Sequence, residues 1–124
     1  MDTARPRAPK DELGRWGEDL ATRHLAEDGL TVLDRNWRCQ DGEIDVIARD
    51  PDRLVFCEVK TRSSEEFGTP AEAVTPAKKA RVRALARRWL DEHEVRAPEL
   101  RLDVISVLAP PGGPVQLEHL CESL

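Results

Sequence analysis

The sequence predicts an α/β fold in which one mixed β-sheet is flanked by helices. Two observations support this prediction. Segments 11–28 and 76–91 repeat their apolar residues at the three- and four-residue spacing of amphipathic helices, and short runs rich in Val, Ile and Leu typical of strands lie between and after them. The resulting order is helix, three strands, helix, then one or two strands, which is typical of a layered α/β sandwich.

Both predicted helices have recognisable ends. Gly29 follows the last apolar position of the first helix and supplies a stop signal. The apolar positions of that helix are Leu13, Trp16, Leu20, Ala21 and Leu25. The second helix begins at Pro76, which suits a first helical position, and Thr75 before it suits the N-cap. Its apolar stripe consists of Val82, Leu85, Ala86, Trp89 and Leu90.

The strands are predicted from their composition and from the turns between them. A turn at residues 40–42 ends the first strand, and Pro51 presets φ for the turn between the second and third. The predicted strands are Leu30–Trp37, Gly42–Arg49, Arg53–Lys60, Arg101–Leu108 and, more weakly, Val115–Leu120. Residues 63–70 are expected to form a loop.

Length and composition fit one globular domain of 124 residues, 40% hydrophobic and 35% charged. We expect this domain to span residues 11–124, after a disordered tail at residues 1–10. No apolar run approaches the ~20 residues that cross a bilayer, and the N-terminus lacks a signal-peptide core, so a cytoplasmic location is expected. The three Cys and three His have no zinc-binding spacing, which predicts reduced thiols and no zinc site.

The net charge of −5 does not favour a nucleic-acid-binding protein, but the charge is unevenly distributed. Segment 78–88 carries a run of basic side chains and no acidic one. The basic residues are Lys78, Lys79, Arg81, Arg83, Arg87 and Arg88. Two interpretations stay open: a solvated helix face, or phosphate contacts along DNA, which would make binding strongly salt-dependent.

Charged residues interrupt the hairpin predicted from the second and third strands. With the turn centred within residues 50–53, the register places Asp45 opposite Glu58. The same register places Glu43 opposite Lys60, where the two could form a salt bridge. Because side chains alternate along a strand, these four residues share one face. The opposite, core-forming face consists of Ile44, Val46, Val55, Cys57 and Val59.

Two directly opposed carboxylates destabilise an ordinary hairpin, because their Cβ atoms lie about 4.5–5.5 Å apart. The pair Asp45 and Glu58 is better suited to a divalent cation such as Mg²⁺ or Mn²⁺, which prefers hard oxygen ligands. Lys60, on the same face, could contact a phosphate. The structural alternative is a solvated hairpin face with a Glu43–Lys60 salt bridge.

Five segments, in order, match a known protein family between Gly14 and Leu120. They are GRWGEDLATRHL (Gly14–Leu25), NWR (Asn36–Arg38), GEIDVIARD (Gly42–Asp50), LVFCEVKTR (Leu54–Arg62) and RLDVISV (Arg101–Val107). Together they resemble the bacterial YraN-like family of predicted endonucleases, which is distantly similar to Holliday-junction resolvases. The wider resemblance is to the PD-(D/E)xK nuclease superfamily, which implies a restriction-endonuclease-like αβββαβ core. The chain differs from that motif at Ile44, where a Pro can precede the Asp.

The resemblance implies Mg²⁺- or Mn²⁺-dependent hydrolysis of DNA phosphodiester bonds. The catalytic candidates are Asp45, Glu58 and Lys60, and the metal-ligand candidates are Glu18, Asp45, Glu58 and the backbone carbonyl of Val59. The nucleic-acid-binding candidates are Arg62, Lys79, Arg83 and Arg87. A resolvase-like activity would also imply a homodimer, since two strands are cut symmetrically.

Three classes of function remain. The first is a DNA endonuclease, including one that cuts branched or junction DNA. The second is a nucleic-acid-binding module that keeps the nuclease fold without turnover. The third is a protein-interaction subunit that uses an exposed Trp37 or the C-terminal strand. The opposed carboxylates favour the endonuclease, because a protein that only binds a phosphate has no need of them.

Overall fold

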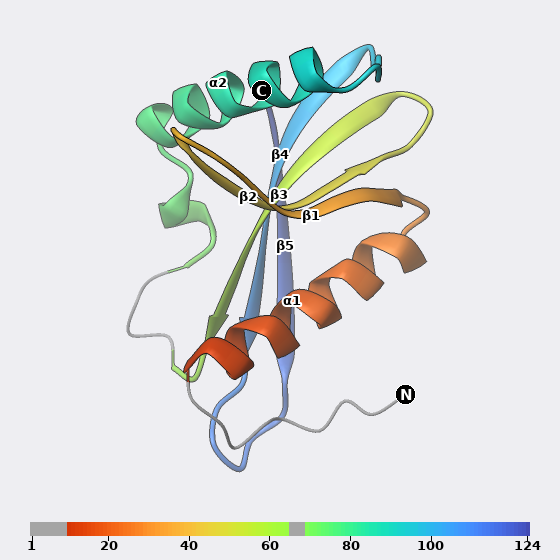
Figure 1. The fold of residues 1–124 in the computed structure, drawn as a ribbon. Coiled ribbons are helices and arrows are strands. Elements are labelled where there is room, and N and C mark those ends of the chain that lie inside the picture. Colours follow the sequence, from red (N-terminus) through yellow and green to blue (C-terminus); the bar gives the residue numbers. More distant parts are fainter. Residues whose placement is uncertain (1–9, 65–68) are drawn as a thin grey trace.

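The computed structural model describes residues 10–64 and 69–124, with side chains from Glu12 onward in the first helix. Figure 1 shows how the helices and strands are arranged. The elements are α1 (Lys10–Glu27), β1 (Thr31–Cys39), β2 (Gly42–Arg49), β3 (Arg53–Arg62), the short 3₁₀ helix η2 (Ala71–Ala73), α2 (Pro76–Glu92), β4 (Glu99–Leu108) and β5 (Gln116–Ser123). The predicted tail lies outside the described residues, except for Lys10, which begins α1.

The five strands form one mixed sheet in the order β1-β2-β3-β4-β5. Strands β3 and β4 are parallel and are connected through α2, while every other neighbouring pair is antiparallel. Thr75 caps α2, because its hydroxyl accepts a hydrogen bond from the backbone N–H of Lys78 at 3.1 Å, as the sequence predicts. The order of elements confirms the α/β prediction and matches a restriction-endonuclease-like core with β5 added at one edge.

The helices cover opposite faces of the sheet, so the protein has two apolar layers (Figure 1). The layer under α1 contains Ala21, Leu25, Val46, Val55, Cys57, Ile105 and Val107. The layer under α2 contains Ile47, Leu54, Phe56, Val82, Leu85, Trp89 and Leu102. Because both faces are packed, the central strands β3 and β4 are apolar on both sides, and a charge in these strands needs a specific partner.

Strand β2 separates from β3 close to its N-terminal end. Val46 pairs with Cys57 in the predicted register, but the ladder ends at this pair. The prediction of a ladder pair between Asp45 and Glu58 is therefore wrong in detail. The cause is local: the carboxylate of Asp45, instead of a strand carbonyl, accepts the hydrogen bond from the backbone N–H of Val59.

Ile44 lies on the other face from the one predicted, because the alternation of side chains breaks within β2: Ile44 packs under α2, whereas Val46 packs under α1. Asn36 has a left-handed backbone (φ 53°), which Asn tolerates better than most residues. The next residue, Trp37, pairs with Ile44, and both pack into the layer under α2. The expectation of an exposed Trp37 is consequently wrong, since this side chain is half-buried.

No helix among residues 10–64 and 69–124 is long and apolar enough to span a bilayer.

Candidate active site

Asp45 occupies the gap where β2 leaves β3. Its Oδ2 accepts a hydrogen bond from the backbone N–H of Val59 at 2.8 Å, which fixes the carboxylate beside the following strand. Burial raises the pKa of Asp45 above its usual value, the bond from Val59 opposes this rise, and the nearby carboxylates of Glu18, Glu58 and Glu43 add to it. This arrangement concentrates negative charge around Asp45 and therefore favours a cation there.

Glu58 points toward α2 and has two differently placed carboxylate oxygens. Its Oε1 lies against the ammonium of Lys78 and 3.5 Å from that of Lys60. Its Oε2 is buried and has no hydrogen-bond partner among the described residues. A buried carboxylate oxygen without a partner is costly in a protein interior. A divalent cation bound beside Asp45 would supply that partner.

The two carboxylates line a pocket of about 200 Å³ between the sheet and the first turns of α2. Its charged lining residues are Glu43, Asp45, Glu58, Lys60, Lys78 and Arg81. The strands thus contribute the three carboxylates and Lys60, and the helix contributes Lys78 and Arg81. This combination can hold a cation and, next to it, an anionic group such as a phosphate diester.

Lys78 is a site residue that the sequence analysis did not identify. It stands in the first turn of α2, and its side chain is only 14% exposed because it reaches across to Glu58. The N-cap at Thr75 was the available signal, since it fixes where the helix starts and hence which lysine of the pair 78–79 faces the sheet. Arg81, one turn further on, lines the same pocket.

The predicted nucleic-acid-binding residues are not all in one place. Arg83 and Arg87 are exposed on α2 and do not line the pocket, whereas Lys79 is half-buried. Arg62 lines a separate hollow of about 240 Å³ together with Ser106, Glu118 and the segment around Pro70. Of the basic residues on α2, therefore, only Lys78 and Arg81 line the pocket that contains the carboxylates.

Glu43 does not pair with Lys60 as predicted. Its Oε2 lies 3.0 Å from Nε of Arg38 on β1, and both side chains are largely exposed. Lys60 instead shares Oε1 of Glu58 with Lys78. The reason is the early separation of β2 from β3, which removes Glu43 from the position opposite Lys60.

Glu18 is buried under the gap, with 8% of its surface exposed. Its Oε1 accepts hydrogen bonds from Nη2 of Arg35 at 2.9 Å and from Nδ2 of Asn36 at 3.0 Å. These donors hold the carboxylate toward the sheet, near Asp45. The ligand oxygens of Glu18, Asp45 and Glu58 do not all lie within 4.8 Å of one another, so Glu18 would move closer, or act through its charge alone, in a site with a bound cation.

Gly17 brings α1 close enough for its neighbour Glu18 to reach the sheet. A Cβ atom added at Gly17 would lie 1.8 Å from Oγ1 of Thr61 on β3. A Cβ atom added at Gly14, one turn earlier, would have no atom within 4 Å. Packing therefore requires a glycine at position 17 but not at position 14.

Substitution of these two glycines should have opposite effects on stability. Gly17→Ala is expected to lower the free energy of unfolding by about 1–3 kcal/mol, the usual cost of overpacking. Gly14→Ala is the matched control and should raise it by about 0.5–1 kcal/mol, because Ala favours a helix interior. Urea unfolding followed by circular dichroism measures both. Equal effects of the two variants would contradict the close approach at Thr61.

Comparison with known proteins identifies the family to which this chain belongs. The family model described as "Uncharacterised protein family UPF0102" matches residues 17–107. A UPF0102 protein of Frankia alni is 58% identical over 111 residues, which cover 90% of this chain and 92% of that protein. UPF0102 proteins of Beutenbergia cavernae (56% over 111 residues, 90% and 94%) and Streptomyces griseus (56% over 108 residues, 86% and 91%) are similarly close. The chain belongs to the UPF0102 family, which confirms the predicted YraN-like resemblance.

Proposed function

We propose that this protein is a metal-dependent endonuclease that hydrolyses phosphodiester bonds of DNA. The observation that supports this function most directly is the buried, unpartnered Oε2 of Glu58 beside the gap that holds Asp45. An arrangement that only bound a phosphate would gain nothing from these carboxylates, because they repel an anion. Lys60 and Lys78 in the same pocket supply the positive charge that a phosphate requires.

The residues fit Mg²⁺ or Mn²⁺, which prefer carboxylate and carbonyl oxygens. Asp45, Glu58 and the backbone carbonyl of Val59 would hold the ion, and Glu18 would add negative charge next to it. When bound, the ion would neutralise charge on the phosphate and lower the pKa of an attacking water.

The basic side chains of the pocket have separate roles in this proposal. Lys60 is 40% exposed and stands at the mouth of the pocket, where it would contact the phosphate that is cut and stabilise the negative charge that develops on it. Lys78 lies deeper and would hold Glu58 in position through its ion pair. Arg81 would bind a neighbouring phosphate from the same helix.

Replacing Lys78 by Met should lower the rate of DNA cleavage by about a hundredfold. The substitution keeps the length of the side chain but removes the cation that positions Glu58, so that this carboxylate is left buried without its closest partner. Arg96→Met is the matched control, because Arg96 is exposed beyond the far end of α2, and it should leave the rate within twofold. The measurement is kcat on a DNA substrate at saturating Mg²⁺. A normal kcat for Lys78→Met would contradict the role of this lysine.

A cleavage screen tests the function as a whole. The substrates are duplex, single-stranded, flap and four-way-junction DNA, each with Mg²⁺, with Mn²⁺ and with EDTA, and Asp45→Ala is the control. We expect metal-dependent cleavage of at least one substrate by the wild type and none by Asp45→Ala. Equal cleavage by both proteins would reject the site. Salt-dependent DNA binding without cleavage would instead support a non-catalytic nucleic-acid-binding module.

A further inference from the structure

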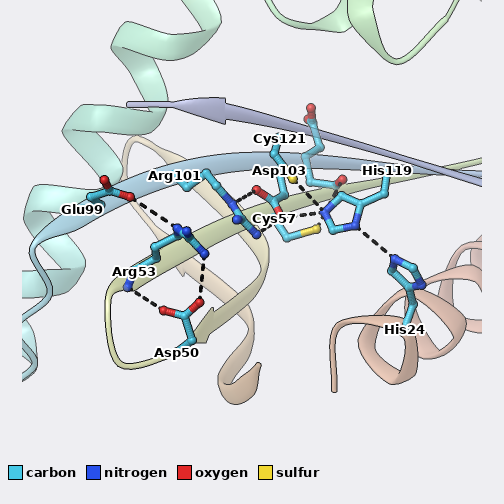
Figure 2. Close-up of polar contacts among 10 residues, drawn as sticks. His24, Asp50, Arg53, Cys57, Glu99, Arg101, Asp103, His119 and Cys121 are labelled. Carbon is cyan, nitrogen blue, oxygen red and sulfur yellow. Dashed lines mark hydrogen bonds and ion pairs between the residues drawn. The ribbon is translucent and has the colours of Figure 1, made fainter. Parts of the chain in front are cut away.

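A second cluster of potential metal ligands lies on the α1 face of the sheet, away from the pocket between β3 and α2. Figure 2 shows it: Asp103 comes from β4, His119 and Cys121 from β5, and His24 approaches from α1. One ligand atom each of Asp103, His119 and Cys121 lies within 4.8 Å of the others, and among the described residues no further group of three meets this criterion. Asp103 is completely buried.

The sheet register brings these residues together although they are distant in sequence. Asp103 is the ladder partner of Cys121 on one side and of Cys57 on the other. His119 precedes Cys121 by two positions on β5, so its side chain lies on the same face. The carboxylate, the imidazole and the thiol therefore project from neighbouring positions toward α1 (Figure 2).

The contacts of His119 distinguish a metal site from a nucleophilic relay. Its Nε2 lies 2.6 Å from Oδ2 of Asp103 and 3.5 Å from Sγ of Cys121. In a Cys–His–Asp relay the thiol and the carboxylate face opposite nitrogens of the imidazole, so that one ring nitrogen takes the thiol proton while the other is held. Here both face the same nitrogen, which excludes that relay. Three different donor atoms instead converge on one point.

Surrounding residues hold this arrangement in the way expected around a metal ligand. His24 Nε2 lies 3.0 Å from Nδ1 of His119, so the ring is oriented, and a proton on Nδ1 leaves the Nε2 lone pair pointing at the cluster. Arg101 donates to both oxygens of Asp103, at 2.7 and 2.9 Å, and fixes the carboxylate. Hydrogen bonds of this kind to metal ligands raise the affinity of a site, because they restrict the orientation of the ligands.

Partial burial of its sulfur and the adjacent carboxylate of Asp103 raise the pKa of the otherwise exposed Cys121, although Arg101 opposes this effect. Burial raises the pKa of Cys57 even more strongly. A divalent ion at the point of convergence would take the place of the proton between His119 and Asp103 and stabilise the thiolate of Cys121.

We propose that Asp103, His119 and Cys121 bind one Zn²⁺, with His24 and Arg101 as the groups that orient its ligands. A mixed set of carboxylate oxygen, imidazole nitrogen and thiolate sulfur suits Zn²⁺ and does not suit Mg²⁺. Binding releases the thiol proton of Cys121 to solvent and moves the proton of the neutral His119 ring from Nε2 to Nδ1, which faces Nε2 of His24. A solvent water completes the coordination, since Cys121 is exposed. The ion would tie the edge strand β5 to β4 and α1. This site is independent of the proposed nuclease activity.

Metal binding to the full-length chain tests the proposal. Co²⁺ serves as a spectroscopic probe, because a thiolate ligand gives a charge-transfer band, and Zn²⁺ affinity is measured by competition with a chromophoric chelator. We expect one equivalent of Zn²⁺ and a thiolate band with Co²⁺. Cys121→Ser should abolish the band, and both Cys121→Ser and His119→Gln should weaken Zn²⁺ binding at least tenfold. His24→Gln should keep the band and weaken binding by about 10–100-fold.

Two control variants separate this site from other thiols and carboxylates. Cys39→Ser removes a cysteine outside the cluster, and Asp91→Asn removes an exposed carboxylate on α2, so neither should change Zn²⁺ affinity. Circular dichroism verifies that each variant is folded. The proposal is overturned if folded Cys121→Ser and His119→Gln bind Zn²⁺ as tightly as the wild type, or if the Co²⁺ complex of the wild type lacks the thiolate band.

Discussion

Asp45→Asn is expected to lower the rate of metal-dependent DNA cleavage by about a thousandfold, or ~4 kcal/mol of transition-state stabilisation. The variant keeps an oxygen that can accept the hydrogen bond from Val59, so the local backbone should be unchanged. It removes the negative charge that a divalent ion requires. Single-turnover cleavage measures the rate, and calorimetric titration with Mn²⁺ measures the loss of metal binding separately from activity.

The same substitution should make the metal-free protein more stable at neutral pH. Burial and the neighbouring carboxylates raise the pKa of Asp45, which means that its charged form disfavours the folded state. Asn carries no charge, so we expect a higher Tm for Asp45→Asn than for the wild type in EDTA. Loss of activity together with a gain in stability is typical of a residue kept for function.

Glu43→Gln is the matched control for Asp45→Asn. Glu43 lies two positions earlier on β2, is largely exposed, and pairs with Arg38 rather than with the pocket lysines. Its replacement should change both the Tm and the affinity for Mn²⁺ only slightly, because exposed ion pairs contribute little. If Asp45→Asn lowered the Tm, or bound Mn²⁺ as well as the wild type did, the carboxylate would be a structural group and not a metal ligand.

Local sequence signals were sufficient for the main elements of the fold. Strand β2 begins and ends at the predicted residues, and α2 starts at Pro76 as its cap at Thr75 indicates. The hairpin register was also predicted, because a short turn leaves little freedom in how two strands pair. These features depend on residues that are close together in the chain, which is why a single sequence reveals them.

Features set by distant contacts were not predicted. Ile44 packs on the same side as Trp37, its ladder partner in the neighbouring strand, next to the left-handed Asn36. The ion pair between Lys78 and Glu58 depends on how α2 docks against the sheet. Alternation along one strand cannot report either contact, because each is decided where two elements meet.

The expectation of no zinc site stays a prediction, because no observation of metal binding tests it. It rested on the spacing of Cys and His along the chain, whereas Asp103, His119 and Cys121 are brought together by the antiparallel pairing of β4 with β5. His24 joins them from α1, at the other end of the sequence. A ligand set assembled from paired strands has no fixed sequence spacing, so it can be recognised only when the pairing of the strands is known.

Asp103→Asn is expected to lower the free energy of unfolding by about 3–5 kcal/mol at neutral pH. Asp103 is fully buried and accepts hydrogen bonds from Arg101 and His119, so loss of its charge leaves the Arg101 guanidinium without its ionic partner. Asp91→Asn, on the exposed face of α2, is the control and should change the value by less than about 0.5 kcal/mol. Urea unfolding in EDTA keeps bound metal out of the comparison.

The pH dependence of the difference in unfolding free energy between wild type and Asp103→Asn shows whether the charge of Asp103 causes it. Burial raises the pKa of Asp103, but the bonds from His119 and Arg101 outweigh burial, so the pKa in the folded state lies below its usual value. The stabilisation is therefore fully present above the unfolded-state pKa of about 3.9 and is lost as the pH falls through the lower folded-state pKa. The gap between wild type and Asp103→Asn should shrink below about pH 4. A gap that stayed constant from neutral to acid pH would mean that packing, and not the charge, makes Asp103 necessary.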